Sequence, residues 1–170
     1  MEPSFEPAGP ITRSVLALRR LVAVSTAFRR RVGVADEAAA HKKIFLFEYA
    51  DDDLTELHAA RPFATIWPAD RLDIEQTAGG ARNWMRAGGE LVLQLTDRDR
   101  YPRDRTLSGL DFAGWIDRVV FDDVRSLAGS NDYLTINHVS FLQTITHNPR
   151  ADDPAGAYWH CALLVRWGRQ

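Results

Sequence analysis

The sequence contains a single cysteine, Cys161, among 170 residues. One cysteine excludes an internal disulfide and is typical of a protein in a reducing compartment. No apolar run approaches the roughly 18 residues that a membrane-spanning helix needs. The opening residues, MEPSFEPAGP, lack the basic and then apolar stretch of a secretory signal. We therefore expect a protein of the cytosol, or of a particle assembled there.

A surplus of charge is also missing, because 21 basic and 23 acidic residues leave a formal net charge of −2. This balance favours neither nucleic acid nor an anionic membrane as a binding partner. Two local runs stand out, the basic Arg29–Arg31 and the acidic Asp51–Asp53. Since charged side chains are rarely fully buried, we expect both runs to be solvated surface.

Motifs for catalysis and cofactor binding are missing as well. The sequence has no GxxxxGK phosphate loop, no GxGxxG after a strand, and no HExxH, paired CxxC or GxSxG. The five histidines occur singly, whereas a metal site commonly takes two ligands from one helical turn or from alternating strand positions. His138 and His160, on neighbouring predicted strands, are the pair that a metal hypothesis could use. We expect no metal, no cofactor and no enzyme activity.

Isolated carboxylates and the lone thiol offer little chemistry. Asp122 and Asp123 are adjacent on a predicted helix, so their side chains point in different directions and do not converge on one ion. Cys161 lies on the apolar face of a predicted strand. We expect it to be a small buried hydrophobic residue and not a nucleophile.

The composition that is present, 45% hydrophobic and 26% charged residues, is that of an ordinary globular domain. We expect one domain over residues 1–170, with residues 1–9 as a flexible N-terminal arm and residues 10–168 as the folded part.

Three helical segments are predicted near the N-terminus. Pro10 suits a first helical turn, and apolar residues at helical spacing follow over residues 11–22. Ser25 is placed to cap a second helix that Gly33 ends. Asp36 is placed to start a third.

Strands are predicted over residues 44–49, 63–67, 133–146 and 158–167, and Pro68 is expected to end the second. A helix over residues 108–128 separates the strand groups. Its apolar stripe has one acidic interruption, at Asp123. The last strand places Trp159, Cys161, Leu163, Val165 and Trp167 on one face, the candidate buried face.

Residues 70–96 predict a long β-hairpin arm, with paired glycines at Gly79–Gly80 and Gly88–Gly89. Trp, Met and Arg are enriched at protein interfaces. The candidate interface residues at the tip are therefore Arg82, Trp84, Met85 and Arg86. The alternative is a tip that folds back on its own domain.

The order of helix, strands, helix and strands, with hairpin-length links, predicts an α+β fold. We expect a mostly antiparallel sheet with helices packed on one face and a long β-hairpin arm.

Several segments together resemble the tail-terminator, or tail-completion, proteins of long-tailed, lambda-like bacteriophages. The similarity runs through VSTAF (24–28), RPFATI (61–66), GELVL (89–93), the helix around 115–127, YWH (158–160) and LLV (163–165). It extends over about residues 11–168. The chain departs from the pattern by a longer acidic connection near Asp51 and by its Trp84-bearing tip.

The resemblance implies a ring of six copies that caps the tail tube and joins it to the head-completion (neck) proteins. Such a ring needs a head-to-tail interface whose rotation closes. It would belong to the tail and neck of the virion, assembled in the host cytoplasm, with no membrane partner. DNA would pass through without specific binding, so clustered basic residues would be unfavourable in the channel. The candidate lumen-facing residues are Asp51, Asp52 and Asp53.

Three alternatives stay open at this point. One is another phage neck component, a head–tail adaptor or stopper. The second is a small cytosolic enzyme whose site forms only in the fold. The third is a solitary regulatory or ligand-binding domain.

Overall fold

A computed structural model of the chain describes residues 10–46, 60–76, 85–128, 135–149 and 156–168. The helices are α1 (Pro10–Val24), α2 (Thr26–Val32), α3 (Glu37–His41), α5 (Arg105–Ile116), the π-helix η2 (Asp117–Val124) and α6 (Arg125–Leu127). The strands are β1 (Ile44–Phe45), β2 (Phe63–Gln76), β3 (Met85–Arg98), β4 (Ile136–Asn148) and β5 (Tyr158–Gly168).

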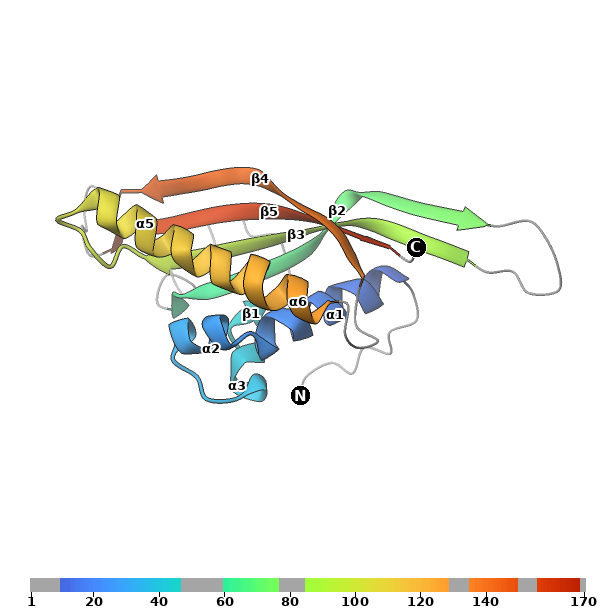
Figure 1. Cartoon of the computed structure of the whole chain (residues 1–170), viewed down its shortest axis with the longest axis horizontal. Coiled ribbons are helices and arrows are strands. Elements are labelled where there is room, and N and C mark those ends of the chain that lie inside the picture. Colours follow the sequence, from blue (N-terminus) through green and yellow to red (C-terminus); the bar gives the residue numbers. More distant parts are fainter. Residues whose placement is uncertain (1–9, 47–59, 77–84, 129–134, 150–155, 169–170) are drawn as a thin grey trace.

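The strands form one five-stranded sheet in the order β1-β2-β3-β5-β4. β1 runs parallel to β2, and every other neighbouring pair is antiparallel. The helices lie together on one face of this sheet (Figure 1). The predicted α+β class, with a mostly antiparallel sheet and helices on one face, is confirmed.

Two of the N-terminal helices begin or end at the capping residues that the sequence predicts. The Phe28 backbone N–H donates to Ser25 Oγ at 3.0 Å at the start of α2. Gly33 ends α2 in the left-handed region, at φ 74°, which glycine adopts without steric cost. The Ala39 N–H donates to Asp36 Oδ1 at 2.8 Å at the start of α3.

The predicted long helix is one continuous helix with a π-helical middle section, η2. A π-helix closes i→i+5 hydrogen bonds in place of the i→i+4 bonds of an α-helix. Asp123, the acidic interruption of the stripe, lies in this section and faces α2. Its Oδ2 accepts hydrogen bonds from Ser25 Oγ at 2.7 Å and from the Ala27 N–H at 3.0 Å. The carboxylate completes the N-terminal cap of α2.

The core lies between the helices and the sheet. On β5, the predicted face of Trp159, Cys161, Leu163, Val165 and Trp167 is buried, each residue at most 9% exposed. Alternate residues of β2 and β3 continue this face, and the core cluster extends to the inner sides of α1 and α5. The assignment of the buried face of β5 is confirmed.

Three strand boundaries differ from the prediction. β2 passes through Pro68 to Gln76, with a register shift between Pro68 and Leu72. β1 ends at Phe45, and Leu46 lies outside it. Gly88 and Gly89 lie within β3 and not beside a turn. Proline is tolerated in β2 because the strand lies near the sheet edge, where one side of the backbone needs no ladder donor.

The hairpin arm is formed by the far ends of β2 and β3. Gly88 is the last β3 residue that pairs with β5, opposite Gly168. Beyond it, the pairs from Ile74 with Ala87 to Gln76 with Met85 form a two-stranded ribbon. This ribbon extends away from the helix-covered body (Figure 1). The predicted long hairpin is confirmed at the level of the backbone.

Candidate functional site

The sequence-predicted interface residues fall in and around this ribbon. Met85 and Arg86 are strand residues of β3, paired with Gln76 and Glu75, and do not belong to a turn. Arg82 and Trp84 lie outside the described residues, as do Asp51, Asp52 and Asp53. The structure therefore gives the backbone positions of Met85 and Arg86 in the hairpin. The acidic run is known from its sequence alone.

An isolated two-stranded ribbon is at best marginally stable in water. The distal pairs of β2 and β3 have no third strand beside them among the described residues. A surface that packs against the ribbon would stabilise it. The ribbon is the first candidate for contact with another molecule.

The two edges of the sheet are a second candidate. β4 forms one edge along its whole length, and no described strand pairs with its outer side. It carries exposed apolar side chains, Phe141 at 46% and Leu142 at 58%. On the other edge, β1 covers β2 only at Ala64 and Thr65, and no described strand pairs with that side beyond them. Unpaired edges are ready to accept strands from other chains.

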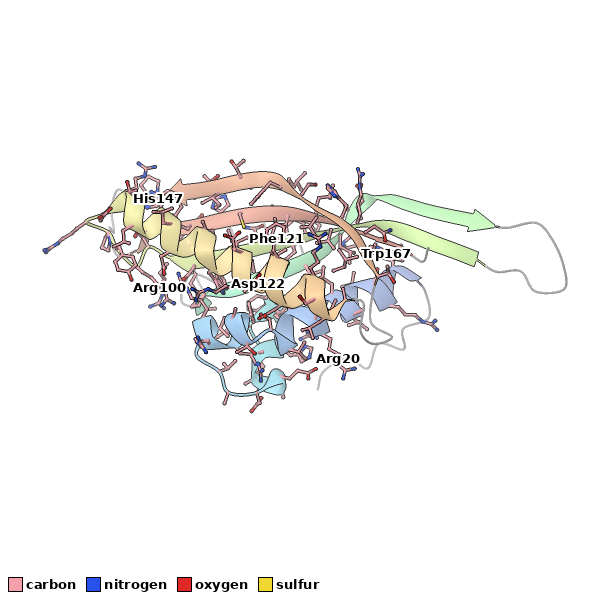
Figure 2. All side chains as sticks on the ribbon, viewed as in Figure 1. Arg20, Arg100, Phe121, Asp122, His147 and Trp167 are labelled. Atoms are coloured by element: carbon pink, nitrogen blue, oxygen red, sulfur yellow. The ribbon has the colours of Figure 1, made fainter. Side chains whose placement is uncertain are left out.

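A polar cluster lies at the end of the molecule opposite the hairpin, where Figure 2 labels His147. His147 Nε2 lies 2.9 Å from Asp99 Oδ2, and Ser108 Oγ donates to Asp99 Oδ1 at 2.5 Å. The Trp159 indole N–H donates to Ser108 Oγ at 2.8 Å. Burial would raise the pKa of Asp99, but hydrogen bonds from Ser108, His147 and the Tyr101 backbone hold it below its ordinary value.

This cluster contains Ser, His and Asp but does not have the geometry of a nucleophile and its base. Ser108 donates to the carboxylate and not to the imidazole, whereas a catalytic serine is hydrogen-bonded to its histidine. Ser108 is also 2% exposed. The cluster joins the loop after β3 to α5, β4 and β5.

An ion network fixes α2 against the sheet and α5. Arg31 Nε and Nη2 each lie 2.5 Å from a carboxylate oxygen, of Asp97 and Asp111 respectively. Arg100 Nε also reaches Asp97, at 2.9 Å, and the Asp97 side chain is fully buried. The hydrogen bond from Arg31 holds the pKa of Asp111 below its ordinary value, against a smaller opposing effect of burial. The expectation that the Arg29–Arg31 run is solvated surface is therefore wrong for Arg31.

The described part of the chain contains no assembled site for metal binding or thiol chemistry. No group of three or more His, Cys, Asp or Glu side chains there is placed to hold a metal ion. His138 pairs with Arg166 and His160 with Thr146, so the two histidines lie far apart along β5. Burial raises the pKa of the Cys161 thiol to about 12, which keeps it protonated.

A hollow of about 20 Å³ lies where the hairpin leaves the body, and its lining includes Trp167. Figure 2 labels this residue. The lining also includes Ile11, Pro68 and Leu91 and contains no histidine. A space of this size holds about one water molecule. No helix among the described residues is long and apolar enough to cross a membrane.

Sequence reasoning did not single out the exposed apolar residues Leu107 and Leu110 of α5 or Phe141 and Leu142 of β4. Hydrophobic periodicity assigns each element one inward face and gives no reason to examine the opposite one. A count of leucines off the inward stripe of α5 would have found the first pair.

Comparison with models of known protein families gives no match to this chain, and comparison with curated proteins gives none either. What the geometry defines is an α+β domain whose described residues include a projecting β-ribbon and two sheet edges with no described strand beside them.

Proposed function

We propose that copies of this chain join head to tail into a closed ring. In this ring the outer edge of β4 of one copy pairs with the free part of the β2 edge of the next. The observation that carries the proposal is that each chain has two different unpaired edges, at opposite sides of one sheet, in its described residues. Two unlike edges favour a heterologous contact, which closes into a ring when the rotation between neighbours is right.

Strand directions support this contact. β2 is antiparallel to β3, β3 to β5, and β5 to β4, so β2 and β4 run in opposite directions. A rotation about an axis along the strands leaves their directions unchanged. β4 of one copy therefore meets β2 of the next in antiparallel orientation, and the antiparallel pattern of the sheet continues across the joint.

A ring of this kind has the described helices on one side of its wall and the opposite face of the sheet on the other (Figure 1). Much of that opposite face is buried within the chain, since Thr65, Val92 and Thr96 are at most 2% exposed, so the part that can meet the channel is the exposed part. Arg166 lies on this face, and its Nε is 2.6 Å from Glu90 Oε1 of the neighbouring strand. A paired guanidinium attracts phosphate less than a free one, so the pair favours a channel through which DNA slides.

We further propose that the ring terminates a phage tail tube and joins it to the head-completion proteins. The resemblance to tail-terminator proteins suggests this role, and the projecting hairpin supplies an element that can reach a neighbour or the last ring of the tube. Growth stops because the ring binds the tube on one side and has no tube-like face on the other.

Mass photometry of the purified protein, alone and with tail-tube protein, tests the proposal. We expect closed rings, either alone or on the tube. A monomer under both conditions contradicts ring formation. Rings that do not bind the tube contradict termination and favour a head–tail adaptor or stopper.

Replacement of Trp84 and Met85 together with serine tests the hairpin. We expect a folded domain with an unchanged circular dichroism spectrum that assembles poorly, because the hairpin loses Trp84 and Met85, two large apolar residues of types enriched at interfaces. Unchanged ring formation and unchanged tube binding would remove the hairpin from the contact.

A further inference from the structure

The outward surface of α5 carries an apolar stripe. Leu107, Leu110, Gly114 and Arg118 follow one another at spacings of three, four and four, which places them on one line along the helix. Leu110 is 66% exposed and Leu107 is 46% exposed. A Cβ added at Gly114 would meet nothing within 4 Å. Among the described residues, the stripe is therefore uncovered at both leucines and has open space at Gly114.

The opposite side of the same helix is already in the core, where Phe112 is 1% exposed and Trp115 is 4% exposed. A helix that is apolar on two opposite sides is typical of a helix covered on both. The inner side of α5 is covered by its own sheet, and we expect the outer side to be covered by another molecule.

The N-terminal end of the stripe is basic. Arg103 and Arg105 are exposed there. The carboxylates nearby are already engaged: Asp104 Oδ1 accepts from the Leu107 N–H at 2.9 Å, and Asp111 is bound by Arg31. A partner segment with leucines and carboxylates would complement both the apolar stripe and its basic end.

Residues 51–57 of this same chain have that chemistry. Their sequence is DDDLTEL, an acidic run followed by Leu54 and Leu57 at a spacing of three, the spacing of Leu107 and Leu110. The segment belongs to the connection between β1 and β2. That connection starts and ends at the sheet edge opposite β4, because Lys43 Nζ donates to the Ala60 carbonyl at 2.9 Å beside β1.

We infer that the α5 stripe of one copy binds residues 51–57 of the next copy in the ring. The N-terminal end of α5 lies beside the end of β4, where the Ser108–Asp99–His147 contacts join the two elements. The β4-to-β2 joint of the proposed ring therefore places the N-terminal end of α5, with Leu107 and Leu110, beside the β1–β2 edge of its neighbour. The inference rests on that proposed function, and it gives Asp51–Asp53 a role between subunits in place of the lumen.

Engineered cysteines test the contact, since the native thiol of Cys161 is fully buried. A Leu110→Cys chain and a differently tagged Leu54→Cys chain are mixed under ring-forming conditions and oxidised. We expect a disulfide between the two tagged chains, formed about tenfold more than with Ser126→Cys in place of Leu110→Cys, because docking raises the local thiol concentration. Ser126 is exposed on α6, well along the same helix, and is the matched control.

Ring formation by the wild-type protein is measured first, by mass photometry. A failure of the proposed ring can then be distinguished from a failure of the α5 contact. Rings without the disulfide between copies overturn the α5 contact and leave the ring. A double Leu54→Cys, Leu110→Cys chain that closes its disulfide at a dilution where it is monomeric also overturns it, because the segment then docks on its own chain. Absence of rings under every condition overturns the proposed function itself.

Charge reversal gives a second readout that does not depend on thiols. Arg103→Glu with Arg105→Glu should lower ring formation about tenfold, and adding Asp52→Arg with Asp53→Arg in the same chain should restore it. Glutamate is favourable at a helix N-terminus, so the first pair should not unfold α5. Loss without restoration overturns the contact.

Discussion

At the scale of single residues, the most consequential contact is the one that Arg31 makes with Asp97 and Asp111. The Asp97 side chain is fully buried and the Arg31 side chain is 14% exposed, so the pair is largely removed from water. Removing the guanidinium would leave Asp97 with the Arg98 backbone N–H and with Arg100, whose own side chain is 42% exposed. A buried charge that loses its partner is strongly destabilising.

Arg31→Met should therefore lower the free energy of unfolding by about 3 kcal/mol, measured by urea denaturation. The neighbouring Arg30 is exposed, so Arg30→Met is the matched control and should change stability by no more than about 0.5 kcal/mol. Equal effects of the two substitutions would mean that the network adds nothing to stability.

The pKa of Asp111 gives a prediction about pH. Its folded-state pKa is depressed, chiefly by the hydrogen bond from Arg31. The stability it contributes is present above its unfolded pKa of about 3.9 and is lost as the pH falls through the folded value. Asp111→Asn should be less stable than wild type at pH 7, and its stability should fall less between about pH 5 and pH 3. Parallel stability curves would contradict this assignment.

At the scale of elements, two glycines of α5 make a matched pair. A Cβ at Gly109 would lie 3.2 Å from the ring of Trp159, whereas a Cβ at Gly114 would meet nothing within 4 Å. Alanine in a helix interior is favoured over glycine by about 1 kcal/mol. Gly114→Ala should raise the thermal midpoint, while Gly109→Ala should lose much of that gain by pressing α5 away from Trp159. The test is a comparison of unfolding midpoints, and a larger gain at Gly109 would contradict the close approach.

Features that depend on neighbouring residues in the sequence were predictable. Features that depend on residues far apart in the sequence were not. Ser25, Gly33 and Asp36 mark helix ends because a cap depends on a few neighbouring residues. Pro68 misled because its tolerance in β2 depends on the position of the strand in the sheet. The Arg31 network joins residues 66 and 80 positions apart, a separation over which sequence pattern carries no signal.

The candidate surfaces also divide into those predictable from the sequence and those that only the structure shows. The existence of the hairpin was predictable from alternation in residues 70–96, although Gly88 and Gly89, expected beside its turn, lie within β3. The edge role of β4 depends on strand order, which places β5 between β3 and β4 although β4 comes first in the chain. The outward leucines of α5 are visible in the sequence, but only a structure shows that nothing in the described chain covers Leu110.

At the scale of the whole molecule, the proposed ring makes the outer edge of β4 its critical joint. Leu142 is 58% exposed in the single chain, so a charged side chain there should leave the fold intact. Edge lysines oppose strand pairing between chains because pairing would take their charge out of water. Leu142→Lys should therefore unfold at the wild-type temperature yet remain monomeric where wild type forms rings.

Mass photometry checks this prediction at matched concentrations, with Ser126→Lys as the control for an added charge away from the edge. Ser126 is exposed on α6, a helix and not a strand of the sheet, so its lysine should leave ring formation unchanged. Rings of normal mass and number from Leu142→Lys would show that β4 is free in the assembly. The proposed joint between sheet edges would then be contradicted. Contacts made by the hairpin alone would have to hold the ring together.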